Sequence, residues 1–598
     1  MVSNDRRILL AALALHIIVL FFAMPASPWE FDEPLFFQGL HDYNPVAHHP
    51  PPPGYPLFMA VGHVVRAIIP SDFLALRTIS FAGSAIGFVL LALAFGNLTG
   101  NRIAGVAGAV LFYFSPALLV HSTLPISEGG AVALLAAALY FASGARVSSP
   151  ALFAAFCALT IGWRIQFTIF VLPLFFTALF LMSSWRDRLR VLAAFTLVCL
   201  LWFVPLAAAV GGPLELYRFE TGQAGYLVEH DADVSRSGWT PPQLVLRFVA
   251  HPWGTKLASF PVLLVAAIGV MAFLRERRRE VIPLAVAAAI YIAFVLAVMD
   301  PADGVRYAIP FVLFTACAAG AGMVWLARRI RVPVAAALAL FACASLVYVS
   351  SLLSQRSSTL SPPVRAAEFA RRTYPANAIA VYELPLWPHA TYLLRKYNPV
   401  RVDEGLARAY ERPDVPMFLY ADGAARGTEA ATFRWEPSDA YSKLTRNHYR
   451  LSSIVPIRPE ERFRAIRGIY GWEREPDGLA WRWLAPLAEM KLPRGPAGQA
   501  MVRAGLPENA PIDANALSVF IDGSPAGTFR VERGRQTVIA VAVPAGAPVL
   551  RFVAAQSFVP AQIAGSLNRD PRTLAVKMYG MTTRRSAAAG AERRAASQ

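Results

Sequence analysis

In the stretch 29-WEFDEPLFFQGLHDYNPVAHHPPPPGYP-56, carboxylates, histidines and a run of four prolines follow an apolar segment, residues 8–25, that is long enough to cross a membrane. The prolines, 50–53, stiffen the chain and cannot continue a helix. The next segment, 55–70, is short, contains His63 and Arg66 and ends in proline. We therefore expect an outside loop that is held down by an amphipathic helix lying along the outer membrane interface.

The composition agrees with a membrane protein. The chain has 598 residues, of which 56% are hydrophobic and only 16% are charged, and its mean hydropathy is +0.44. Apolar runs recur up to about residue 355 and then stop, which predicts a membrane domain followed by a water-exposed region. The net charge of +17 does not indicate a nucleic-acid partner, because many arginines lie between apolar runs. In such positions they determine the orientation of helices in membrane lipid.

The cysteines exclude two kinds of protein. All four cysteines lie inside apolar runs, so neither a disulfide framework nor a cysteine-based metal site is expected. Residues 8–25 resemble a secretory signal, but the many later apolar runs favour an uncleaved signal anchor.

We count about eleven transmembrane helices. With a cytoplasmic N-terminus, the arginine clusters at 6–7, 185–190, 275–280 and 328–331 all fall on the cytoplasmic side, as the positive-inside rule requires, and the tail after residue 355 emerges outside. Residues 150–183 could also form one long span instead of two. The eleven segments are 8–25, 73–95, 103–120, 124–143, 150–163, 166–183, 190–210, 257–274, 281–299, 307–327 and 333–353.

Ionisable residues gather at the outer ends of these segments, where they are costly and therefore candidates for function. Acids and arginines from five separate turns could meet in one outward-facing cavity. They are Glu30, Asp32, Glu33 and Asp42, then Arg77, Glu128, Arg164 with Gln166, and finally Asp303, Arg306 and Tyr307.

Each candidate also has an ordinary structural interpretation. An arginine at a helix end often reaches toward lipid headgroups, and Glu128 could simply complement a helix dipole. His48 and His49 are weak metal candidates, because their spacing matches no standard site. Asp32 has no obvious structural task, so a functional role is favoured for it.

The membrane region resembles the integral-membrane glycosyltransferases of the GT-C class, especially the branch of protein O-mannosyltransferases and lipid A aminoarabinose transferases. The resemblance rests on the order of several motifs rather than on one specific motif. They are 31-FDEPLF-36, 50-PPPPGYP-56, the helix and Gly-Arg turn in 76-LRTISFAGSAIGFVLLALAFGNLTGNRIAGVAGAV-110, 125-PISE-128 and 306-RYAIP-310.

The resemblance implies transfer of a sugar from a polyprenyl-phosphate donor in the outer leaflet to an extracytoplasmic glycan, lipid or protein. It makes Asp32 the catalytic base of an inverting reaction and places Arg77 at the lipid phosphate, with Arg306 as a second phosphate ligand. Glu33 is a second catalytic candidate beside Asp32, and Glu33 and Glu128 would orient sugar hydroxyls or a cation. Arg164, Gln166 and Tyr307 are further substrate-binding candidates by placement. Some relatives use a metal and others do not, so a divalent cation stays open.

The hydrophilic regions carry further predictions. The acidic loop 211–256 is either an outer lid or simply solvated chain. Residues 356–488 suggest an extracytoplasmic α/β domain. Residues 489–582 suggest a β-sandwich with a hairpin at Asp522–Gly523, which would hold a glycan acceptor or serve as a platform. Residues 583–598 suggest a disordered tail, and residues 1–355 form the transmembrane domain.

Two other functions compete with sugar transfer. A transporter or flippase of lipid-linked sugars would show internal repeats and mid-membrane polar groups, and we find neither. A non-catalytic glycan-binding membrane protein would leave the Asp-Glu pair and the arginines without a task. The features suit a multi-pass protein of a bacterial inner membrane, with its C-terminal region in the periplasm. Neither the sugar nor the acceptor can be read from the sequence.

Overall fold

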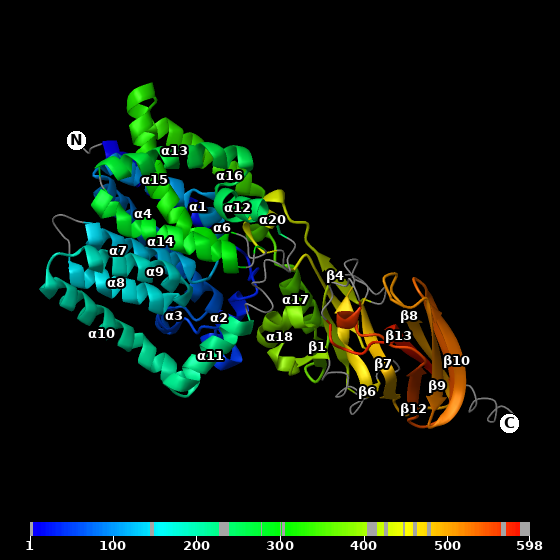
Figure 1. Cartoon of the computed structure of the whole chain (residues 1–598). Helices are drawn as coiled ribbons and strands as arrows, with labels where there is room; N and C mark the ends of the chain where they lie inside the picture. The colour runs from blue at the N-terminus through cyan, green and yellow to red at the C-terminus, as the bar shows by residue number, and fades with distance from the viewer. Residues whose placement is uncertain are drawn as a thin grey trace, which may run out of the picture. The chain divides into compact units, whose positions relative to one another are not determined.

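A computed structural model describes residues 4–143, 149–226, 239–276, 278–299, 301, 305–402, 415–423, 429–446, 449–457, 463–474, 480–563 and 570–585. The chain divides into two compact units. Unit 1 comprises Met1–Ser361 and Glu436–His448, and unit 2 comprises Pro362–Trp435 and Tyr449–Gln598. The expected division into a helical membrane region and a β-rich C-terminal region is confirmed (Figure 1).

In unit 1, helices are the main secondary structure of the described residues (Figure 1). Its first half contains α1 (Asn4–Phe22), α2 (Glu33–Gly39), η1 (Pro45–Ala47), α3 (Pro56–Ile68), α4 (Asp72–Thr99), α5 (Arg102–Tyr113), α6 (Pro116–His121), α7 (Glu128–Ser143), α8 (Pro150–Trp163), η2 (Ile165–Phe167) and α9 (Thr168–Leu181). Its second half contains α10 (Trp185–Val210), α11 (Pro213–Tyr226), α12 (Pro241–Val245), η4 (Leu246–Ala250), η5 (His251–Trp253), α13 (Lys256–Glu276), α14 (Arg278–Val298), η7 (Arg306–Ala308), α15 (Ile309–Ile330), α16 (Val334–Ser358) and α20 (Asp439–Leu444).

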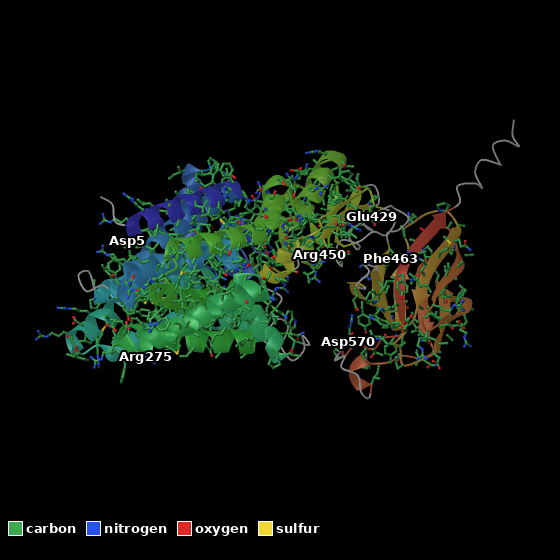
Figure 2. All side chains as sticks on the ribbon, turned by 90° about the horizontal axis from the view of Figure 1, so that it is seen from above. Asp5, Arg275, Glu429, Arg450, Phe463 and Asp570 are labelled. Atoms are coloured by element: carbon green, nitrogen blue, oxygen red, sulfur yellow. The ribbon has the colours of Figure 1, made fainter. Side chains whose placement is uncertain are left out.

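Many of these helices suit a membrane. Within the described residues, six segments are long and apolar enough to span a bilayer, and five more apolar helices are shorter. The count of eleven spans therefore stays a prediction, as does the interfacial position of α3. Residues 150–183 form two helices, because Arg164, between α8 and η2, has an extended backbone conformation that interrupts the helix. Figure 2 shows Asp5 and Arg275 toward the same end of unit 1, which the sequence predicts to be cytoplasmic.

Glycines allow α4 and α7 to approach each other backbone to backbone. A methyl group added to Gly83 would lie 2.6 Å from the nitrogen of Gly130, and one added to Gly129 would lie 2.5 Å from the carbonyl oxygen of Ser80. The Ser80 hydroxyl also donates to the carbonyl of Ile126 at 2.6 Å. This close crossing fixes the start of α7, where Glu128 lies.

Unit 2 begins with a small α/β region. Its five-stranded sheet has the order β2-β1-β3-β5-β4, with β1 parallel to β2 and β3 and the other pairs antiparallel. The apolar strands make a core, and Tyr420 is anchored by its hydroxyl to the carbonyl of Pro363 at 2.7 Å. The elements are α17 (Pro362–Thr373), β1 (Ile379–Tyr382), η8 (Leu384–Leu386), α18 (Trp387–Leu393), η9 (Arg395–Tyr397), β2 (Val400–Arg401), β3 (Met417–Asp422), β4 (Ala431–Arg434) and β5 (Leu451–Pro456).

The second sheet of unit 2 has eight strands in the order β10-β9-β12-β7-β13-β8-β11, with β6 paired to β7. Its end strands β10 and β11 approach each other, so the sheet curls around an apolar core. The predicted domain boundary at 488/489 falls within β7. The elements are β6 (Arg464–Arg474), β7 (Ala480–Lys491), β8 (Gly498–Gly505), β9 (Ala514–Ile521), β10 (Ser524–Glu532), β11 (Gln536–Val543), β12 (Val549–Ala554), η11 (Pro560–Gln562) and β13 (Val576–Arg585).

The predicted hairpin is present. Strands β9 and β10 pair in antiparallel fashion across Asp522 and Gly523, whose φ angles of 46° and 86° are those of a two-residue hairpin turn. The first residues of the expected disordered tail, 583–585, continue β13, and residues 586–598 lie outside the described part of the chain.

We expect Gly83→Ala to lower the unfolding temperature of the purified protein. The added methyl group would overpack the α4–α7 crossing and lower the free energy of unfolding by about 1–3 kcal/mol. Gly96→Ala is the matched control in the same helix, since its methyl group would meet no atom closer than 3.6 Å. Equal unfolding temperatures for the two variants would contradict the tight crossing.

Candidate functional site

Four charged side chains from distant parts of unit 1 meet in one cluster. The Oε1 atom of Glu128 forms an ion pair with Nη1 of Arg164 at 2.8 Å and a second ion pair with Nε of Arg306. The same Arg306 donates from Nη1 to Oδ2 of Asp32 at 2.9 Å. We call Asp32, Glu128, Arg164 and Arg306 the charge cluster. The sequence predicted all four as site residues, and the structure brings them together.

The four side chains of the charge cluster differ in how much they are exposed to solvent. The side chains of Glu128 and Arg164 are only 2% and 3% exposed, that of Arg306 is 13% exposed, and that of Asp32 is 27% exposed. Charges that leave water must be paired, and here each buried charge has an opposite partner. Asp32 is the member that an incoming molecule can reach most easily.

The local backbone explains how each residue arrives. Asp32 immediately precedes α2, where its carbonyl accepts the first helical bonds while its side chain makes no capping bond and stays free for Arg306. Arg164 lies at the extended break after α8, and its Nη1 atom also donates to the Ser127 hydroxyl at 2.8 Å. The indole of Trp163 donates to the Ser127 carbonyl at 2.9 Å, which ties the break to the start of α7.

Two further candidates border the cluster. Gln166 donates from Nε2 to the hydroxyl of the buried Tyr55 at 2.9 Å, and the Arg164 guanidinium lies 5.9 Å from the Tyr55 ring. Tyr307 follows Arg306 in the same short turn, η7.

The charge cluster and the neighbouring Gln166 leave four buried polar atoms without a partner in the described part of the chain. They belong to one carboxylate, two guanidinium groups and one amide, and they are Oε2 of Glu128, Nε of Arg164, Nη2 of Arg306 and Oε1 of Gln166. Buried polar atoms are nearly always hydrogen-bonded, and each unpaired one costs about 1–3 kcal/mol. Their gathering around one cluster fits a ligand that carries both donors and acceptors.

Arg77 is a separate buried cation. It lies in α4, is 6% exposed and approaches the ring of Phe73 at 5.8 Å. It makes no ion pair with any described residue, and its Nη2 atom is buried without a partner. The structure gives no direct contact between Arg77 and Asp32. Arg77 does lie about one helical turn before Ser80, which bonds to the turn leading into Glu128.

Glu33 belongs to a second group of charges. It is fully buried, and its Oε2 atom accepts the backbone N–H of Trp29 at 2.7 Å. Burial, with a smaller contribution from Glu30, raises the pKa of Glu33 to about 8, so this carboxyl is largely protonated at neutral pH. Glu30 itself pairs with Arg356 in the last turn of α16, with Oε1 and Nη2 at 2.6 Å.

Three buried ionisable residues of unit 1 were missed in the sequence. Arg356, Arg247 and His121 are each 4% exposed or less. Of the three, only Arg356 has a sequence feature that could have identified it, because it is a lone cation in the last turn of an apolar helix. Asp303 and the acids 229–233 of the outer loop lie outside the described residues, and the described Glu215 pairs with Arg218 at 2.6 Å.

The histidines form no evident metal site. His49 approaches Asp42 at 3.5 Å, and His48 lies beside it in the same loop. Among the described residues, no group of three His, Cys, Asp or Glu side chains could hold a metal ion.

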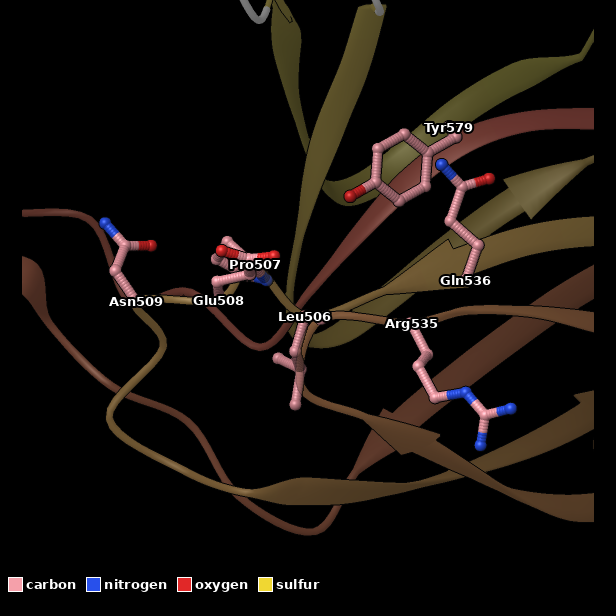
Figure 3. Close-up of a pocket in the computed structure, with 8 residues that line it drawn as sticks. Leu506, Pro507, Glu508, Asn509, Arg535, Gln536 and Tyr579 are labelled. Atoms are coloured by element: carbon pink, nitrogen blue, oxygen red, sulfur yellow. The ribbon is translucent and has the colours of Figure 1, made fainter.

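Unit 2 carries a polar hollow of about 470 Å³. Figure 3 shows Tyr579 and Gln536 on one side of it and Glu508 and Asn509 on the other. The buried Trp481 and Trp483 lie elsewhere, in an apolar cluster with Leu574, as core residues do.

No protein-family model matches the chain, and no curated protein matches it in sequence. Among solved structures, apo ArnT from Cupriavidus metallidurans is similar with a TM-score of 0.50 at 12% identity, over 76% of this chain and 98% of ArnT. An oligosaccharyltransferase from Archaeoglobus fulgidus is similar with a TM-score of 0.46 at 12% identity, over 96% and 97%. The arabinofuranosyltransferase AftD from Mycobacteria is similar with a TM-score of 0.42 at 12% identity, over 98% and 59%.

The similarity to ArnT establishes the fold of the chain. The expected GT-C architecture, a helical membrane region followed by an extramembrane region, is thereby confirmed.

The raised pKa of Glu33 predicts how stability depends on pH. The folded protein keeps the proton up to about pH 8, whereas the unfolded chain loses it near the ordinary value of 4.5. The stabilisation from this proton is therefore complete below pH 4.5 and is lost as the pH rises to about 8. Because Glu33→Gln cannot ionise, we expect its unfolding temperature to change less between pH 5 and pH 8 than that of the wild type. The exposed Glu276→Gln is the control, and a Glu33→Gln profile parallel to the wild type would refute the assignment.

Proposed function

We propose that this protein is an inverting glycosyltransferase that moves a sugar from an outer-leaflet polyprenyl-phosphate donor to an acceptor outside the membrane. The observation that carries the proposal is the charge cluster, in which an accessible carboxylate lies against a guanidinium and unpartnered buried polar atoms surround it. The GT-C fold shared with ArnT supports it.

Asp32 is the proposed base. An acceptor hydroxyl attacks the anomeric carbon, the new C–O bond forms as the bond from that carbon to the phosphate oxygen breaks, and the acceptor proton passes to the Asp32 carboxylate. The polyprenyl phosphate leaves with the bonding electrons. Attack from the face opposite the phosphate inverts the anomeric carbon. Because phosphate leaves already ionised, no general acid is needed.

Arg77 and Arg306 are the proposed phosphate ligands. A guanidinium stays charged and can donate two N–H groups to a phosphate, which stabilises the negative charge that builds on the leaving oxygen. Arg77 has no anionic partner among the described residues, and Nη2 of Arg306 is unused. Both features support a role in binding an anion.

The remaining unpartnered atoms suit a sugar. Oε2 of Glu128 and Oε1 of Gln166 accept hydrogen bonds, and Nε of Arg164 donates one. Tyr307 is adjacent. Glu33 lies in the group around Arg356, so we assign it to support of the Asp32 loop rather than to the sugar. Neither His48 nor His49 enters the proposed mechanism.

A polyprenyl phosphate is the natural probe. A second structure of ArnT from the same organism, with a TM-score of 0.48 at 12% identity, is bound to undecaprenyl phosphate. We place this protein in a bacterial inner membrane with a cytoplasmic N-terminus, so that the charge cluster faces the periplasm with unit 2.

We expect Asp32→Asn to lower transfer about a thousandfold, because a general base typically contributes a factor of 10² to 10⁴. Membranes lacking the native protein are supplied with purified variant and a panel of labelled polyprenyl-phosphate pentoses and hexoses, and release of undecaprenyl phosphate is measured. Asp42→Asn is the control, since this loop carboxylate is exposed and lies outside the charge cluster.

Full activity in Asp32→Asn would remove Asp32 from the mechanism. Wild-type protein that moves the labelled lipid between leaflets without transferring its sugar would instead establish a flippase, and binding without either event would establish a receptor.

We expect Arg77→Gln to weaken binding of undecaprenyl phosphate about 10- to 100-fold, because a hydrogen bond to a charged group is worth about 1.5–3 kcal/mol. Binding is measured by native mass spectrometry or thermal stabilisation in detergent. The exposed Arg102→Gln, at the first residue of α5, is the matched control. Unchanged affinity in Arg77→Gln would exclude this arginine from the phosphate site.

A further inference from the structure

The short helix α20 belongs to unit 1, although the chain on both sides of it belongs to unit 2. It packs against α6, α16 and η5. Its last three carbonyls, those of residues 442–444, have no partner within the helix, as at any helix end. Two residues of the membrane region supply those partners.

Arg247 joins α20 to Pro301, and its own segment η4 packs against η7, the turn that carries Arg306. Its Nη1 atom donates to the carbonyls of Ser442 and Lys443 at 2.8 and 2.7 Å. Its Nε atom donates to the carbonyl of Pro301 at 2.8 Å. Arg247 is 4% exposed, so water cannot readily replace these bonds. One rigid guanidinium thus fixes Pro301, five residues before Arg306, against α20.

His121 joins α20 to the turn before Glu128. Its Nε2 atom lies 3.2 Å from the carbonyl of Leu444 and donates to it. His121 ends α6 and is buried, and the chain reaches Glu128 seven residues later.

Tyr441 joins α20 to the loop that carries Asp32. The ring of Tyr441 lies 5.6 Å from the guanidinium of Arg356. Arg356 in turn holds Glu30, two residues before Asp32, at 2.6 Å.

Each chain segment that supplies Asp32, Glu128 or Arg306 is therefore connected to α20. We propose that α20 is a positioning element of the charge cluster, and that Arg247 is the positioning residue that sets Arg306 through Pro301. This inference rests on the proposed function, because it treats Arg306 as a phosphate ligand. It adds a role for residues 436–446, which lie more than 120 residues beyond Arg306 in the chain.

A double-mutant cycle tests the inference with undecaprenyl phosphate as the probe and full-length protein in detergent. If Arg247 acts through Arg306, Arg247→Gln should weaken binding about tenfold in the wild-type background but less than about twofold in an Arg306→Lys background. In an Arg77→Lys background, the same change should again cost about tenfold, because Arg77 lies on α4 and has no contact with Pro301 or Arg247 among the described residues. The exposed Arg218→Gln should have no effect.

The outcomes separate the two proposals. If Arg306→Lys binds like the wild type, the phosphate role of Arg306 fails. Suppose instead that Arg306→Lys weakens binding of undecaprenyl phosphate. If Arg247→Gln then binds normally, or costs as much affinity in the Arg306→Lys background as in the Arg77→Lys background, only the positioning role fails. Should Arg247→Gln not fold, the cycle is run with Arg247→Lys. Lysine keeps the charge but cannot hold both carbonyl groups of α20 and that of Pro301 in one plane. The same pattern of non-additivity is expected.

Discussion

The arrangement of unit 1 depends on one carboxylate oxygen, Oε1 of Glu128, which two guanidinium groups share. Arg164 and Arg306 cannot stay buried without it, and Arg306 in turn holds Asp32. The formal charges of the four cluster residues sum to zero, so the two carboxylates and the two guanidinium groups balance one another. In the proposed function, the lipid phosphate adds negative charge that a further cation must balance, and Arg77 lies in α4 without an anionic partner among the described residues.

The helices that carry these groups are joined by close contacts near Glu128. Glycines let α4 and α7 meet backbone to backbone, Ser80 bonds to Ile126, and the Trp163 indole bonds to Ser127. Each contact ends within two residues of Glu128. Glu128 is therefore held in place through its neighbours in the chain. In the proposed function, this rigidity preorganises the charge cluster for electrostatic stabilisation of the leaving group.

Much of this was predictable because charge is costly in an apolar chain. Asp32, Glu128, Arg164 and Arg306 stood out as ionisable residues at the ends of apolar segments, and the hairpin at Asp522–Gly523 followed from its turn residues. The pairing of Arg306 with both acids could not be predicted, because sequence order does not give distances between turns. The protonated state of Glu33 depends on complete burial, which adjacent Asp32 does not share. Arg247 was missed because it lies among ordinary loop residues, and its partners are backbone carbonyls, which every residue has.

The placement of α20 has a consequence for how such a chain can evolve. A polypeptide that leaves one module, contributes a helix to another and then returns cannot be recombined at a single junction. A gene fusion that replaced everything after Ser361 would also remove the carbonyls that Arg247 and His121 hold. The two units are thus expected to be inherited as one piece, and exchange of unit 2 should be tolerated only where the incoming sequence brings its own equivalent of this helix.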